Sequence, residues 1–212
     1  MEIQSNSRQI PKTKDCCSDK RYSDIIYAYF QALSLTDTDD NGGLTQRYVP
    51  KSMVNYVDWA KKFDLTRQTV SKRIKGLQER GLVSYDEKKK IYRLTKLENK
   101  TAALIPFDTV KFMVDALSDN AISAYVYFLN RFIAEGEKPY VFTLVQVKDF
   151  LGLGTASRSN DDTITNILFA LQKLGLNEYS MTASVQEETS FKNVKTIYRI
   201  DKVVNQIKVL KK

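Results

Sequence analysis

The chain contains no histidine and only two cysteines among its 212 residues. Without histidine, His-based catalytic triads and His-containing zinc sites are excluded. Two cysteines cannot build an all-cysteine zinc site, and Cys16 and Cys17 are adjacent, which makes a disulfide between them a poor interpretation. A secreted scaffold would use more cysteines. We therefore expect no metal, no cofactor and a cytoplasmic, nucleoid-associated location.

Long apolar runs are also missing, since none approaches the ~18 residues of a membrane span. Residues 1–5 lack the apolar core of a signal peptide. The chain has no Gly-rich loop of the ATP-binding type, and the glycines at 152 and 154 lack the third glycine of a dinucleotide loop. No paired-carboxylate or nucleophile arrangement stands out, so we expect a protein that is not an enzyme.

Positive charge is in excess, with 33 Lys and Arg against 25 Asp and Glu and a formal net charge of +8. Basic proteins of this size often bind polyanions, and nucleic acid leads that list. The alternative on charge alone is a basic protein with no special partner. A hydrophobic fraction of 42% supports globular cores, and the length fits one large domain or two of about 100 residues.

One sequence pattern occurs twice. Residues 77–94 read Leu-Gln-Glu-Arg-Gly-Leu-Val-Ser-Tyr, a lysine run, then Ile-Tyr-Arg-Leu; residues 171–200 read Leu-Gln-Lys-Leu-Gly-Leu-Asn-Glu-Tyr, a longer polar stretch, then Ile-Tyr-Arg-Ile. Each copy predicts a helix end and a glycine stop, followed by a strand, a loop and a returning strand. Such a hairpin directly after a helix is a wing. We predict an α+β, mainly helical fold made of two tandem winged helix-turn-helix domains.

Apolar periodicity and turn residues set the expected boundaries. Thr66, Thr143 and either Asn160 or Asp161 are expected to cap the helices that follow them. Helices are expected from 24 to 33, 54 to 63, 66 to 80, 107 to 117, 121 to 133, 144 to 150 and about 160 to 174. Strands are expected at 48–49, 82–86, 91–94, 140–142, 176–183 and 194–200. The predicted organisation is a disordered polar tail at 1–20, domain 1 at 21–96, a linker at 97–106, domain 2 at 107–202 and a basic tail at 203–212.

The helix that follows Thr66 is the strongest candidate for reading DNA. Between Thr66 and Gly81 it carries five cations against one anion. An inward stripe of Val70, Ile74 and Leu77 leaves the polar residues on other faces. Arg and Gln side chains suit guanine and adenine edges in the major groove. The candidate contacts are Arg67, Gln68 and Ser71 with bases, Thr69 and Lys72 with phosphates, and Lys75 on the same exposed side; the alternative is a merely solvated face.

The two wings and the second domain supply further candidates. Lys88, Lys89 and Lys90 at the first wing tip suit the phosphate backbone or a minor groove, although a soluble hairpin tip often carries lysine too. In domain 2 the corresponding helix is slightly acidic, which suits the helix dipole but repels phosphate. Its candidates for DNA contact are Ser157, Arg158, Ser159, Thr163, Thr165, Asn166, Lys192 and Lys195. The alternative is that domain 2 dimerises or binds a protein partner.

Residues 37–42 mimic the opening of a calcium-binding loop. Position 12 of such a loop should supply a bidentate glutamate, but it is Tyr48 here. A strand with a proline also replaces the required exit helix. We therefore predict a turn over residues 36–43 and no metal at this segment.

Residues 60–83 resemble winged-helix DNA-binding proteins generally. Residues 105–112 and 121–132 are similar to plasmid and phage replication initiators of Gram-positive bacteria, and the resemblance covers roughly residues 21–200. It implies paired winged helices that bind repeated origin sequences on double-stranded DNA. Replication or transcription proteins and a second copy of the chain are further candidate partners. A transcriptional regulator that binds an operator and a winged-helix interaction adaptor remain alternatives.

Overall fold

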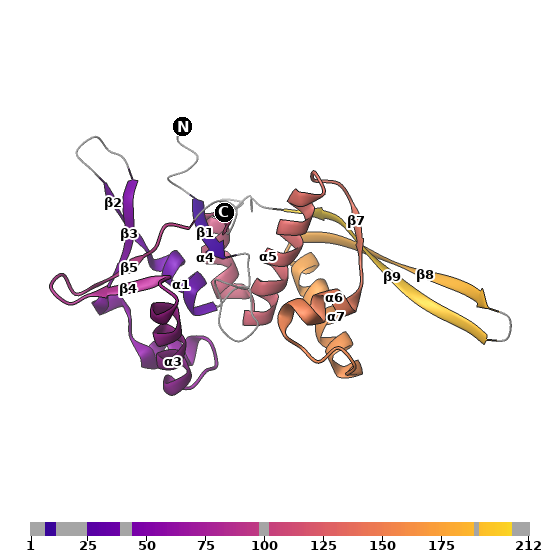
Figure 1. The fold of residues 1–212 in the computed structure, drawn as a ribbon, viewed down its shortest axis with the longest axis horizontal. Coiled ribbons are helices and arrows are strands. Elements are labelled where there is room, and N and C mark those ends of the chain that lie inside the picture. Colours follow the sequence, from indigo (N-terminus) through magenta and orange to yellow (C-terminus); the bar gives the residue numbers. More distant parts are fainter. Residues whose placement is uncertain (1–6, 12–24, 39–43, 98–101, 189–190, 205–212) are drawn as a thin grey trace.

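The computed structural model describes residues 7–11, 25–38, 44–97, 102–188 and 191–204. This part of the chain forms an α+β protein with seven α-helices and three small antiparallel sheets. Figure 1 shows helices α4 (Phe107–Ala116) and α5 (Asp119–Ala134) in the middle, with the first half on one side and the remaining elements on the other.

The first half contains three helices and a four-stranded sheet. Its sheet order is β2-β3-β5-β4, all antiparallel. The predicted helices and the predicted hairpin are confirmed. The elements are α1 (Ile25–Leu33), β2 (Leu35–Thr38), β3 (Leu44–Pro50), the 3-10 turn η3 (Lys51–Met53), α2 (Tyr56–Lys62), α3 (Arg67–Glu79), β4 (Val83–Asp86) and β5 (Ile91–Leu94).

The turn predicted at 36–43 is wrong for residues 36–38, which belong to β2. Thr36 pairs with Arg47 and Asp37 with Gln46 across the β2–β3 ladder. The Asp and Thr composition favours a turn locally, but pairing with a strand further along the chain overrides that propensity. Most of the proposed turn, residues 39–43, lies outside the described residues.

The second half repeats the order of the first. It contains β7 (Tyr140–Phe142), α6 (Leu144–Leu151), α7 (Arg158–Lys173), β8 (Asn177–Glu188) and β9 (Phe191–Val203), with sheet order β7-β9-β8. In both halves a helix, a strand, two helices and a hairpin follow in order, although the first half has the additional strand β2 before β3. The returning strand of each hairpin lies between its two neighbours, as in β3-β5-β4. The second hairpin is longer than its predicted strands.

Helix boundaries follow the predicted caps in most places. The Thr66 side chain accepts a hydrogen bond from the Thr69 amide at 3.0 Å, and Thr143 forms a capping box with Gln146. Gly81 and Gly175, with φ of 68° and 69°, end α3 and α7 as expected. The cap predicted at Asn160 or Asp161 is wrong. Helix α7 begins earlier, at Arg158, and its N-cap, Ser157, makes no side-chain capping bond.

The expected disordered tail and polar linker both contain strand. Strand β1 (Ser7–Pro11) pairs antiparallel with β6 (Ala102–Pro106), so these predictions are wrong for both segments. Ile10 and Ile105 are 1% and 0% exposed, and the Gln9 amide exchanges two hydrogen bonds with the Leu97 backbone. Five residues with one large apolar side chain give little periodicity, and the partner strand lies far along the chain. The rest of the tail, residues 12–20, and the C-terminal residues 205–212 lie outside the described part.

One hydrophobic core runs through both halves of the described chain. It includes Phe30 and Trp59 from the first half and Phe128 and Leu168 from the second, and α1 packs against α4. The domain boundaries predicted from the sequence therefore separate two repeats of the same order of elements, but the hydrophobic core is continuous across these boundaries.

Asp119 at the start of α5 joins three helices. Its Oδ1 accepts a hydrogen bond from the Ile25 amide at 2.9 Å, and its Oδ2 accepts one from the Arg73 guanidinium at 2.8 Å. The Arg73 and Asp119 side chains are each only 18% exposed. The carboxylate therefore fixes α3 against α1 and the first turn of α5.

We expect Asp119→Ala to lower the free energy of unfolding by about 1–3 kcal/mol, because a partly buried carboxylate that accepts two hydrogen bonds is lost. Urea denaturation measures the change. Asp115→Ala is the matched control, since Asp115 is 65% exposed and its ion pair with Lys62 should contribute less than about 1 kcal/mol. Equal effects from the two variants would contradict the role of Asp119.

Candidate nucleic-acid interface

The outer face of α3 is polar and open to solvent. Val70, Ile74 and Leu77 are at most 1% exposed and fix which face points inward. Arg67, Gln68, Ser71, Lys72 and Lys75 are all exposed. The predicted division of this helix into an apolar inner stripe and a polar outer face is confirmed, and the helix is thereby free to present cations to a ligand.

Two residues of α3, Arg73 and Thr69, interact with other residues of the protein. Arg73, one of the five cations counted in the sequence, is turned to Asp119. Thr69 is half-buried, and its Oγ1 lies 2.9 Å from the Oγ1 of the cap residue Thr66. Lys75 has an exposed ion pair with Glu79 at 3.7 Å, a weak interaction in water. The cationic part of the outer face is therefore Arg67, Lys72 and Lys75.

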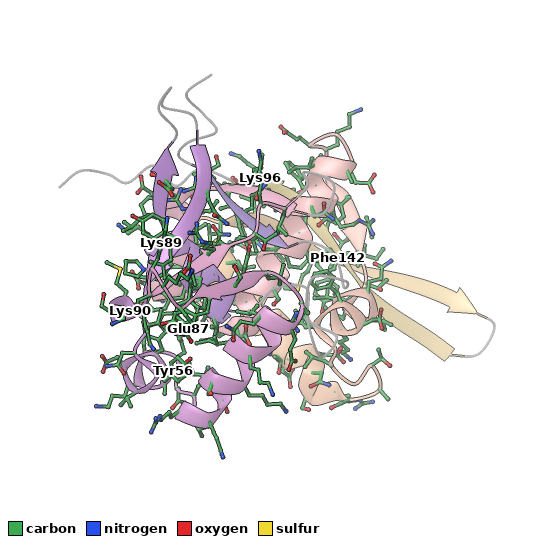
Figure 2. The ribbon with its side chains drawn as sticks, turned by 60° about the vertical axis from the view of Figure 1, so that its left-hand side comes forward. Tyr56, Glu87, Lys89, Lys90, Lys96 and Phe142 are labelled. Carbon is green, nitrogen blue, oxygen red and sulfur yellow. The ribbon has the colours of Figure 1, made fainter. Side chains whose placement is uncertain are left out.

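The first hairpin, β4–β5, presents its lysines from a well-supported turn. The Asp86 carboxylate accepts hydrogen bonds from the Lys88 and Lys89 amides, each at 3.1 Å, and pairs with Arg93 at 3.0 Å. These bonds, that to the Lys89 amide above all, hold the pKa of Asp86 below its ordinary value. The Lys88, Lys89 and Lys90 side chains are exposed. Figure 2 shows Lys89, Lys90 and Glu87 on the same side of the ribbon as Tyr56, the first residue of α2.

Lys51 joins this lysine cluster, and the sequence analysis missed it. Its amide donates to the Lys90 carbonyl at 2.9 Å, and its ammonium lies 5.1 Å from the centroid of the Tyr85 ring. Interaction with Tyr85 raises the pKa of the Lys51 ammonium above its ordinary value. No local pattern marks Lys51; the pairing of β3 with β5 brings it to the turn.

The corresponding helix of the second half, α7, offers fewer cations. Arg158, Ser159 and Asn166 are exposed. The Thr163 and Thr165 hydroxyls donate to the Ser159 and Asp161 carbonyls at 3.0 Å each. The Ser157 and Ser159 hydroxyls lie 2.7 Å apart. The structure therefore brings these predicted residues together at one helix end but uses most of their hydroxyls locally. Lys192 and Lys195 lie in β9, and their side chains are outside the described part.

A buried lysine that the sequence analysis missed orders the turn before α7. Lys148, only 3% exposed, donates to the carbonyls of Thr155 and Ser157 at 2.9 and 3.0 Å, and its ammonium lies 2.6 Å from the Asp161 carboxylate. In the sequence, the place of Lys148 next to Val147 on the inward side of its helix could have indicated that this lysine is buried. The Asp161 charge is thus balanced within the protein, and Asp162 is the exposed anion of the helix start.

The two repeats differ at an exposed position of these helices that the glycine stops align. Lys75 and Phe169 each stand six residues before the glycine stop of their helix. Phe169 is 61% exposed. Where α3 presents a cation, α7 presents an aromatic ring, so the second helix is not a copy of the first in its surface chemistry.

None of the helices in the described part is long and apolar enough to cross a membrane. Within the same ranges, no group of three or more Cys, Asp and Glu residues is placed to hold a metal ion. Comparison with protein-family models, with curated proteins and with solved structures returned no match.

Proposed function

We propose that this chain is a double-stranded-DNA-binding protein built from two winged helix-turn-helix units. The observation that carries the proposal is the exposed cationic face of α3, formed by Arg67, Lys72 and Lys75, together with three exposed lysines at the tip of the hairpin that follows it. The repeated sequence of helix, strand, two helices and hairpin supports the winged-helix assignment, as does the central position of each returning strand.

In this proposal α3 enters the major groove and the first hairpin contacts the backbone beside it. Arg67 and Gln68 lie in the first turn of α3, from which side chains usually reach base edges. Arg suits guanine and Gln suits adenine. Lys72, Lys75, Lys51 and the lysines of residues 88–90 neutralise phosphates, which position the protein without reading sequence.

The particular role we propose is that of a replication initiator of a bacterial mobile element. Two winged helices in one chain can span adjacent groove segments, which suits direct repeats of an origin. A transcriptional regulator that occludes a promoter is the second candidate, and a single reader of that kind usually needs a dimer and a palindrome. An adaptor that uses winged helices only to bind proteins is a third, because fold does not fix function.

Selection of bound sequences from a random DNA pool separates these roles. We expect enrichment of a motif in direct repeats, which supports an origin-binding role. Enrichment of one palindrome would support a repressor instead. If no motif is enriched over the input pool, sequence-specific DNA binding is contradicted.

The salt dependence of binding tests the electrostatic part of the proposal. If about five to eight phosphates are neutralised, a plot of log affinity against log salt concentration should fall with a slope near −5 to −7. A fluorescence-anisotropy titration of a duplex at several salt concentrations measures it. A flat salt response would show that the cationic face does not bind DNA.

A further inference from the structure

The second hairpin extends well past the point at which the first one turns. The two share an Ile-Tyr-Arg segment in their returning strands, so the pair Asp86–Ile91 corresponds to Thr182–Ile197. The first hairpin turns directly after that pair. The second continues for six more pairs, from Ala183–Thr196 to Glu188–Phe191. At about 3.4 Å per residue this adds roughly 20 Å, and Figure 1 shows β8 and β9 projecting beyond the helices.

Strand β8 forms an open edge of its sheet. The order β7-β9-β8 leaves one side of its 12 residues without a paired strand in the described part of the chain. Between Tyr179 and Gln186 the sequence has no charge, no proline and no glycine. Proteins usually protect edge strands with lysine, proline, bulges or short length, because an open edge is a template for pairing. The one bulge lies near the base, at Glu178–Tyr179.

The extension is electrically neutral in a basic chain. Its charges are Glu187 and Glu188 on β8 and Lys192 and Lys195 on β9, against +8 for the whole sequence. A neutral ribbon has little attraction for phosphate, and it adds no charge repulsion of its own where two copies meet. Met181, at the base of the extension, is 53% exposed.

We propose that β8 pairs antiparallel with β8 of a second copy of this chain across a two-fold axis. An isologous dimer requires a self-complementary surface, and an antiparallel edge strand pairs with itself in this way. With Thr182 on the axis, the exposed Glu178 faces Gln186 of the second copy, so no like charges oppose each other between residues 178 and 186. The dimer also converts a two-stranded ribbon, which is marginal alone in water, into a four-stranded one.

This pairing is independent of DNA binding and is tested without DNA. In an armless variant, which lacks the extension, residues 183–196 are replaced by Glu-Lys-Lys-Lys, the turn that joins Asp86 to Ile91 in the first hairpin. Sedimentation equilibrium should show a dimer for the parent chain and a monomer for the variant. The two proteins should have equal melting temperatures and the same helical signal in circular dichroism. A monomeric parent chain across the micromolar range overturns the proposal, and so does a dimeric armless variant.

Single cysteines locate the contact. In a Cys16→Ser, Cys17→Ser background, Ser180→Cys, Thr182→Cys and Ser184→Cys are oxidised separately. Only a residue on the two-fold axis opposes its own copy, with Cα atoms about 4.5–5.5 Å apart and within disulfide range, so Thr182→Cys tests the stated register and the other two variants test axes at residues 180 and 184. We expect a covalent dimer from at least one β8 position and none from the control Thr196→Cys on β9. Cross-linking at no β8 position, or equally at residue 196, overturns edge-to-edge pairing.

Discussion

Reversing the three cations of α3 should abolish specific DNA binding. In Arg67→Glu, Lys72→Glu, Lys75→Glu, affinity for a selected duplex is expected to fall at least about 100-fold. Each base or phosphate contact of this kind contributes on the order of 1–3 kcal/mol, and carboxylates add repulsion. All three side chains are exposed, so the free energy of unfolding should change by less than about 0.5 kcal/mol for each. Anisotropy titration and urea denaturation measure the two quantities.

The matched control separates a defined interface from bulk charge. Lys111→Glu, Lys138→Glu, Lys173→Glu reverses three exposed lysines away from α3 and produces the same change of net charge. We expect this control to weaken binding less than tenfold. Equal losses in both variants would mean that net charge alone attracts DNA. Unchanged cellular activity in the α3 variant would favour an adaptor that binds protein.

Removing residues 1–11 should destabilise the whole protein, although their composition is that of a tail. Ile10 and the buried Arg8 are lost, and Ile105 becomes uncovered. Arg8 donates to the Gln31 carbonyl at 3.0 Å, and its guanidinium lies 4.0 Å from the centroid of the Phe107 ring. Burial of one large apolar side chain is worth about 1.5–3 kcal/mol, and the hydrogen bonds of β1 add to it. We expect the free energy of unfolding to fall by about 3–5 kcal/mol.

The control for this deletion is removal of residues 1–6 alone, which leaves β1 intact. Urea denaturation of the two truncated chains should show a shift for the longer deletion and almost none for the shorter. Ile10→Ala, expected to cost about 2–5 kcal/mol, should reproduce most of the effect without shortening the chain. If the longer deletion leaves stability unchanged, the β1–β6 pairing contributes nothing to the folded state.

Several residues near the candidate interface act through partners that no local pattern connects to them. The Asp119 carboxylate accepts from the amide of Ile25, 94 positions away, and Gln9 exchanges hydrogen bonds with Leu97, 88 positions away. Arg73 was counted among the five cations of the helix, but its guanidinium is turned to Asp119. Charge counts along a helix therefore overstate the cations that the helix offers to a ligand.

The sequence by itself determined the helices and the glycine stops before the two hairpins, since each depends mainly on neighbours within about one helical turn. The stripe of Val70, Ile74 and Leu77, the cap at Thr66 and the glycine stops at Gly81 and Gly175 were predicted and are present. Tertiary structure alone decided the strand at Ser7–Pro11, the lysine at position 51 beside the hairpin tip and the buried Lys148 under α7. These depend on pairing and packing between distant or successive elements, which periodicity does not encode.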